Sequence, residues 1–257
     1  MPPLPFDSEP AGRRRGEGWP RPPADFAPIL ATKDPVLLVG GQAVNLWALY
    51  YKDRTADLAP FVSRDADVLG DRETLSALGT LAGVRPQFFP LRPPSNEVGV
   101  VIAKDVNGSP MLIEVLRYVH GVSTEELREP AYTLALGEKQ IRVQVPGPIA
   151  LLQAKIANVV DLKQTGRQDA RHVIILTRLL PAYLEDLRRS AVEGRMDERK
   201  LLRFLDQLLA VVTTKNGRKV FAELKIDAGK LFSDLDSATL PKLKAFLEKR
   251  LPRMLIL

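Results

Sequence analysis

The spacing of apolar and polar residues along the chain changes at residue 146. Before that point, short aliphatic runs alternate with helical stretches. After it, apolar residues recur at helical spacing with no further strand pattern. We therefore predict an α+β fold, in which a mixed β-sheet with flanking helices is followed by an all-helical domain. The predicted division is a disordered arm at 1–24, an α/β domain at 25–146 and a helical domain at 147–257.

The individual elements follow from the same pattern, together with turn and capping signals. Between two predicted strands, the segment 105–109 contains Asn-Gly, a strong hairpin signal. Pro181 suits a helix start, so we predict separate helices on either side of it. The predicted strands are 36–39, 65–69, 86–90, 97–104, 110–118, 132–136 and 139–145. The predicted helices are 42–51, 71–82, 123–129, 148–162, 168–180, 183–190, 197–212, 217–224 and 241–250.

Composition restricts the location of the protein and the kind of metal it binds. No stretch approaches the roughly 18 uncharged apolar residues that cross a bilayer, and the N-terminus lacks an apolar signal region. We therefore predict a cytoplasmic protein with no membrane partner. The absence of cysteine excludes disulfides and thiolate metal sites. His120 and His172 are the only histidines and are predicted to be structural, so oxygen ligands and Mg²⁺ or Mn²⁺ are favoured.

The net charge of +6 is unevenly distributed. Residues 151–257 carry 21 Lys and Arg against 13 Asp and Glu, a net charge of +8, whereas residues 1–150 carry −2. A basic half suits contact with nucleic acid or nucleotide phosphates. Solvated helix faces rich in Lys and Arg explain the same composition equally well.

Two aspartates on one predicted strand are the strongest chemical signal. If the strand at 65–69 is extended, Asp65 and Asp67 project from one face, about 7 Å apart. Neighbouring carboxylates on an apolar strand repel each other and cost desolvation energy unless a positive charge neutralises them. A divalent cation with oxygen ligands would do so. Upstream, Gly40-Gly41 before a helix offers free backbone N–H groups to an anion such as phosphate.

Glu114 is a candidate third acid, because it is the only polar residue in the otherwise apolar run 111–116. A strand covered on both faces has this composition. With the aspartate pair, Glu114 would complete the carboxylate set of a two-metal phosphoryl-transfer site. The alternatives are that Glu114 pairs with Arg117 or another basic group, or that Asp105 is the third acid. Asp105, however, lies in a hairpin turn, where aspartate is common.

These residues resemble the signature of the DNA polymerase β-type nucleotidyltransferase superfamily. That signature is a hydrophobic residue and a glycine pair, here 39–41, then two aspartates separated by one residue on the next strand, here within 63–68. A third acid on a later strand is matched by Glu114. Within the superfamily the segment 36–175 is most similar to the AbiEii-type nucleotidyltransferases. The chain departs from the pattern in the long connection between Gly41 and Asp65 and in having Glu where Asp is usual.

The resemblance implies further nucleotide-binding residues. In AbiEii-type proteins a helix lysine and a following basic segment with an aspartate contact the nucleotide, and Lys155 and Asp169 match these positions. Gly40, Gly41 and Ser63 are assigned to nucleotide binding in the same way. A lysine ammonium suits neutralisation of triphosphate charge. The alternative is a surface helix followed by a charged loop.

The predicted function is a metal-dependent transfer of a nucleoside monophosphate from a nucleoside triphosphate to an acceptor. Catalysis and metal binding are assigned to Asp65, Asp67 and Glu114, with Mg²⁺ or Mn²⁺ as cofactor. The positive charge of the helical half favours RNA, including tRNA, as acceptor, and protein is a further candidate. The resemblance implies a toxin-type role and a cognate antitoxin. Three alternatives remain: a catalytically silent nucleotide- or RNA-binding module, a transferase acting on an aminoglycoside-like small molecule, and a purely structural protein, which would leave the acid pair unexplained.

Overall fold

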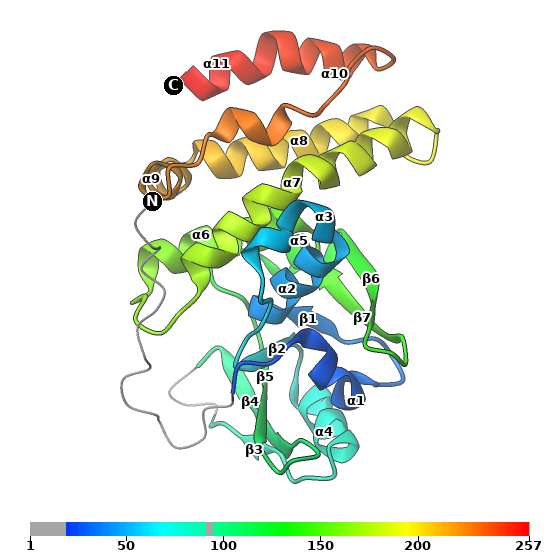
Figure 1. The fold of residues 1–257 in the computed structure, drawn as a ribbon, viewed down its shortest axis with the longest axis vertical. Coiled ribbons are helices and arrows are strands. Elements are labelled where there is room, and N and C mark those ends of the chain that lie inside the picture. The colour runs from blue at the N-terminus through cyan, green and yellow to red at the C-terminus, as the bar shows by residue number, and fades with distance from the viewer. Residues whose placement is uncertain (1–18, 91–94, 257) are drawn as a thin grey trace.

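The computed structural model describes residues 19–90 and 95–256, and it is a mixed α/β structure, as predicted at that level. A seven-stranded sheet forms the lower half of Figure 1, and helices cover it and extend away from it. The strand order is β3-β4-β5-β2-β1-β7-β6. The strands are β1 (Leu37–Val39), β2 (Asp65–Leu69), β3 (Gln87–Phe88), β4 (Glu97–Lys104), β5 (Pro110–Leu116), β6 (Ala131–Leu136) and β7 (Ile141–Pro146).

Strand β2 lies in the middle of the sheet, antiparallel to β1 and parallel to β5. Its alternation of faces is as predicted. Ala66 and Val68 are fully buried in the core, while Asp65 and Asp67 point to the other face and are half-buried. The register pairs Asp67 with Glu114 on β5. All three predicted acids therefore lie on one face of two adjacent strands.

The helices of the first part agree with the predicted pattern, including two caps. Asp71 accepts a hydrogen bond from the backbone N–H of Thr74, and Ser123 accepts one from Glu126 in the same way. The predicted loop after the first helix contains two further helical turns. The elements are η1 (Pro23–Phe26), α1 (Ala27–Leu30), α2 (Gly40–Tyr50), α3 (Lys52–Thr55), η2 (Ala56–Leu58), α4 (Arg72–Leu81) and α5 (Thr124–Arg128).

After β7 the described chain is helical to residue 256. One prediction is wrong: α7 runs without a break through Pro181. Proline removes a hydrogen bond at a cost of about 3 kcal/mol, but the helix is anchored on both sides by buried residues such as Leu180 and Leu184. The elements are α6 (Pro148–Asp161), α7 (Asp169–Val192), α8 (Glu198–Thr213), α9 (Lys215–Glu223), η3 (Ala228–Phe232), α10 (Pro241–Ala245), η4 (Phe246–Arg250) and α11 (Leu251–Ile256).

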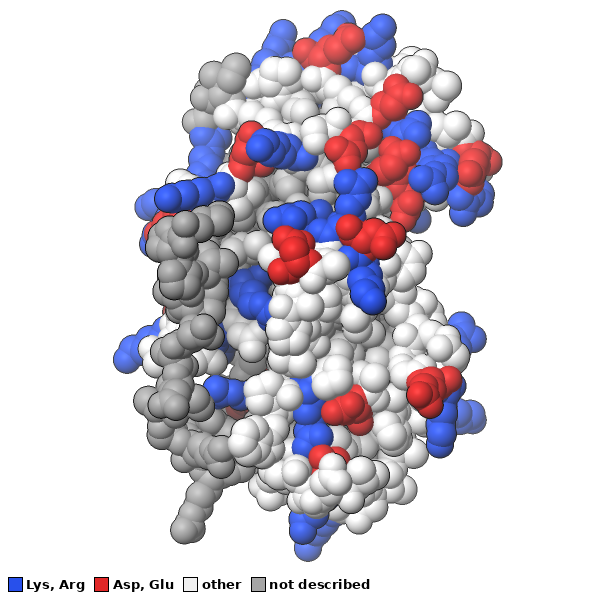
Figure 2. All heavy atoms as spheres, in the orientation of Figure 1, with Lys and Arg blue, Asp and Glu red and all other residues white. Residues whose placement is uncertain are grey.

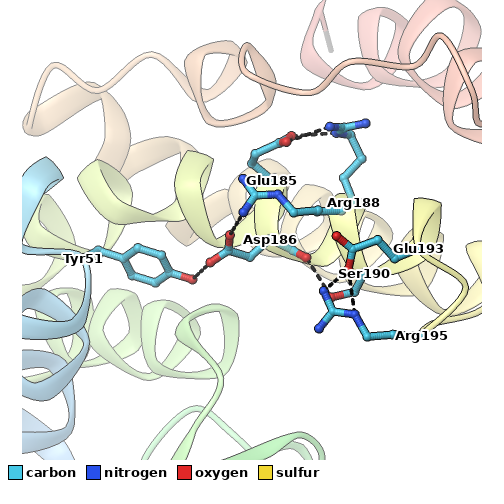
Figure 3. Close-up of polar contacts among 8 residues, drawn as sticks. Tyr51, Glu185, Asp186, Arg188, Ser190, Glu193 and Arg195 are labelled. Atoms are coloured by element: carbon cyan, nitrogen blue, oxygen red, sulfur yellow. Dashed lines mark hydrogen bonds and ion pairs between the residues drawn. The ribbon is translucent and has the colours of Figure 1, made fainter.

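Helices α6 and α7 join the two parts of the chain. They form the layer between the sheet and the outer helices in Figure 1, and α7 packs against both α2 and α8. The indole N–H of Trp47 donates to the carbonyl of Pro146 at 2.8 Å. The hydroxyl of Tyr51 donates to Asp186 on α7 at 2.9 Å, as Figure 3 shows. One apolar cluster therefore continues across the predicted boundary at 146–147.

The predicted disordered arm falls mainly on residues 1–18, which lie outside the described residues. Its last residues are placed, and Arg21 is buried and pairs through its backbone with Ser63. The folded chain therefore begins before residue 25.

On the face that Figure 2 shows, the basic residues of the helical part do not form a uniform patch. In Figure 2, Lys and Arg alternate with Asp and Glu over the outer helices on the face shown. Figure 3 shows part of the reason: Arg188 binds Glu185 and Arg195 binds Glu193 at the end of α7. On this face the pattern is that of solvated helices. No helix in the described residues is long and apolar enough to cross a bilayer.

Candidate functional site

A cleft of about 710 Å³ lies where the N-terminus of α2, strands β2 and β5, and helices α6 and α7 meet. It brings together every predicted site residue, although these come from segments more than 100 positions apart. The predicted residues that line it are Gly40, Gly41, Ser63, Asp65, Asp67, Glu114, Lys155 and Asp169.

The two glycines allow α2 to start directly against the acids. Gly40 has a positive φ of 64°, and a Cβ there would lie 1.8 Å from Oδ2 of Asp67. A Cβ on Gly41 would lie 2.8 Å from Oγ of Ser63 and 3.1 Å from Cε1 of His172. The first turn of a helix has N–H groups without intrahelical partners. Here those donors begin at the wall of the cleft, next to a carboxylate.

Burial and the charge of Asp65 raise the pKa values of the other two acids. Burial, followed by the charges of Asp65 and Glu114, raises the pKa of Asp67 well above its usual range, while Lys155 and Arg167 oppose the shift. Burial and Asp65, with Glu97, raise the pKa of Glu114 to about 7. The hydroxyl of Ser63 donates to Asp65 at 3.2 Å. Asp65, Asp67 and Glu114 therefore form an acidic side of the cleft.

Neither alternative to Glu114 as the third acid fits the structure. The guanidinium of Arg117 donates to the carbonyls of Ser95 and Glu97, at 2.9 and 2.6 Å, and no ion pair to Glu114 occurs among the described residues. Asp105 does not line the cleft. It forms an ion pair with Arg21 at 2.7 Å and accepts two backbone hydrogen bonds in its own turn.

Opposite the acids, Asp169 binds two cations at the start of α7. Its Oδ1 accepts from Nζ of Lys155 at 2.9 Å and from Asn158 at 3.2 Å, and its Oδ2 accepts from Nε of Arg167 at 2.6 Å. Burial acts to raise the pKa of Asp169, but Lys155 and Arg167 outweigh it and hold the pKa at about 2. The side chain of Asp169 is only 2% exposed. Asp169 therefore positions the cations, with both carboxylate oxygens occupied.

Arg167 and His172 contribute more to the cleft than the sequence indicated. Arg167 lowers the pKa values of both Asp67 and Glu114, and its side chain is 42% exposed. His172, predicted to be structural, lines the cleft beside Gly41, and neither ring nitrogen has a hydrogen-bond partner within the described chain. Burial lowers the pKa of His172 well below its usual value, so the ring is neutral. In the sequence, Arg167 is one of several basic residues in the segment that follows α6, and the contact of His172 with Gly41 joins two distant parts of the chain.

The acids have the donor chemistry for a hard cation but do not form a closed cage. Within the described residues, no three acidic or histidine side chains are grouped as a metal centre. Mg²⁺ is usually bound by one or two carboxylates, with substrate phosphates completing its coordination. Asp65 and Asp67, two residues apart on one face of β2 with Glu114 alongside, fit that mode of binding.

A second cavity of about 650 Å³ lies on the other side of α6, lined mainly by apolar atoms and without these acids. It shares only His120 with the cleft, and His120 pairs there with Asp161 at 2.8 Å. The predicted acids and Lys155 line the first cleft and not this cavity.

Comparison of the chain with protein-family models, curated proteins and solved structures finds no match. The chemistry of the cleft therefore has to be deduced from its own residues.

Proposed function

We propose that the protein transfers a nucleoside monophosphate from a nucleoside triphosphate to a hydroxyl-bearing acceptor, with Mg²⁺ or Mn²⁺. One observation carries the proposal: Asp65, Asp67 and Glu114 share one face of two paired strands, directly at a helix N-terminus. This arrangement supports the resemblance to nucleotidyltransferases of the DNA polymerase β type. Asp65 and Asp67 would hold the cation, with Glu114 as an additional ligand.

The cations and backbone donors provide the phosphate-binding side. Lys155 is fixed by Asp169, and Arg167, which is more exposed, can reach a triphosphate. The first N–H groups of α2 are free to donate to an anion. A bound divalent cation would neutralise charge on the phosphates and carboxylates. The residues of the cleft thus act mainly by positioning and charge neutralisation, as is general in phosphoryl transfer.

The reaction itself is a substitution at the α-phosphorus. The acceptor oxygen forms a bond to that phosphorus, and the bond from it to the oxygen bridging the α- and β-phosphates breaks. Pyrophosphate leaves with the bonding electrons, and the hydroxyl proton passes to a carboxylate of the cleft.

Transfer of label tests the proposal. The protein is incubated with each α-³²P-labelled nucleoside triphosphate, Mg²⁺, and tRNA or a protein extract, and label on the acceptor or released pyrophosphate is measured. Asp65→Asn/Asp67→Asn should abolish transfer. Asp53→Asn/Asp57→Asn, which removes two exposed carboxylates outside the cleft, is the matched control. Unchanged transfer by the Asp65/Asp67 variant would refute the proposal. Nucleotide binding without turnover would instead indicate a binding module.

A further inference from the structure

An irregularity in β4 brings a fourth carboxylate to the cleft. Strands β4 and β5 are antiparallel, and the pairing shifts between Glu97, opposite Leu116, and Gly99, opposite Val115. The extra residue, Val98, forms a β-bulge. Because directly paired residues share a face, Glu97 lies on the face of Leu116 and Glu114. With regular pairing, Glu97 would share the face of Val115, which is fully buried in the core.

The bulge is built into the packing of the sheet. A Cβ on Gly99 would lie 2.2 Å from the carbonyl oxygen of Gln87 on β3 and 2.6 Å from Leu75. Glycine at this position therefore lets the two strands approach closely where the register shifts. The backbone carbonyl of Glu97 is held by Arg117 and Ser95.

The side chain of Glu97 has no structural partner among the described residues. It lines the cleft and is half-buried, and no hydrogen bond or ion pair to its carboxylate occurs in the part of the chain that the structure describes. A partly buried carboxylate without a partner costs stability. A ligand that binds the Glu97 carboxylate in the cleft would account for this position.

The strand order places Glu97 on the β4 side of the cleft, separated from the N-terminus of α2 by β5 and β2. The cleft is also lined by Tyr118, which is 53% exposed. If the triphosphate lies against the N-terminus of α2, Glu97 lies on the side where an attacking group would enter.

We propose that Glu97 is the acceptor-side catalytic carboxylate: it accepts the hydrogen bond of the attacking hydroxyl and takes its proton as the new P–O bond forms. This inference rests on the proposed function. The electron pair freed on the acceptor oxygen makes the bond to the α-phosphorus, and pyrophosphate departs with the electrons of the broken bond. Glu97 ends the step protonated.

Two substitutions separate this role from nucleotide or metal binding. Glu97→Gln keeps the shape of the side chain but cannot take a proton, and Glu97→Ala leaves space for a small acid. Glu138→Gln, in the exposed turn between β6 and β7, is the control. Binding is measured by calorimetry with Mg²⁺ and a triphosphate whose α,β-bridging oxygen is replaced by methylene. Transfer is measured as pyrophosphate release, with water or an acceptor as nucleophile.

The expected result is a loss of transfer with binding retained. Glu97→Gln should bind the analogue within twofold of the unsubstituted protein and lose about 100-fold or more in rate, the usual range for a lost acid–base group. Formate should restore part of the rate to Glu97→Ala. Full activity of Glu97→Gln would refute the role of Glu97 and leave the proposed function standing. Binding of the analogue that is weakened as much as by Asp67→Asn would do the same. No pyrophosphate release by the unsubstituted protein would overturn the proposed function as well.

Discussion

Gly40 and Asp67 are in such close contact that a single added carbon on Gly40 would lie 1.8 Å from the carboxylate. This contact joins the first residue of α2 to the middle of β2. It sets how near the helix donors come to the acids, and so it fixes the geometry of the whole cleft.

Gly40→Ala should therefore destabilise the protein more than Gly83→Ala does. Both glycines have φ of 64°, but nothing lies within 4 Å of a Cβ at Gly83. Gly83→Ala thus measures the left-handed backbone cost alone, about 1–2 kcal/mol. Gly40→Ala should lower the free energy of unfolding, measured in urea, by more than this, and it should also weaken nucleotide binding. Equal losses would show that the contact with Asp67 has no energetic weight.

Glu114→Gln should stabilise the protein at pH 8 and have little effect at pH 4. The pKa of Glu114 is raised from its usual 4.5 to about 7. Between these values the unfolded chain ionises while the folded protein keeps its proton, so stability falls as pH rises across this window. Above pH 7 the gain on substitution should be roughly 1–3 kcal/mol, discounted for solvent access. Chemical unfolding at both pH values measures it, and Glu138→Gln should show no such difference.

Asp169→Asn should cost about 3–5 kcal/mol, because it leaves the buried ammonium of Lys155 without its partner. Asp57→Asn breaks an exposed pair with Arg178 and should cost less than about 1 kcal/mol. In a double-mutant cycle, Lys155→Met should cost less in the Asp169→Asn background than alone. Additive losses would mean that the two side chains are not coupled.

His172→Gln should reduce the loss of folding stability that occurs as the pH falls below 6.5. The pKa of His172 lies well below its usual 6.5 in the folded protein. Below pH 6.5 the unfolded chain therefore binds a proton that the folded protein does not, and stability falls as pH falls, by up to about 1.4 kcal/mol for each pH unit. The difference between variant and unsubstituted protein from pH 7 to 5 isolates this contribution from the acids. His120→Gln, at an exposed site, is the control.

Local sequence rules were sufficient for the elements that carry the acids. Alternation placed Asp65 and Asp67 on one face of β2, and side-chain oxygens at Asp71 and Ser123 marked the starts of α4 and α5. The isolation of Glu114 in an apolar strand indicated its position in the middle of the sheet. These features depend on neighbours a few residues away, which a single sequence displays.

What the sequence did not reveal depends on tertiary contacts. Proline normally interrupts a helix, but burial on both sides of Pro181 keeps α7 continuous. The place of Glu97 depends on a one-residue shift between two strands, and the pattern of β4 gives no sign of it. His172 lies next to Gly41, which is 131 residues earlier in the chain. Predicting any of these three features requires knowing which segments of the chain pack together.

The continuity of α7 also determines what a shortened protein would be. The helix begins in the cleft with Asp169 and His172, spans about 36 Å at 1.5 Å per residue, and ends among the outer helices. A chain cut after β7 would keep the carboxylates and lose Lys155 and Arg167, two of the cations that line the cleft. The helical part therefore supplies Lys155 and Arg167 to the cleft, and both halves of the sequence are needed to build its lining.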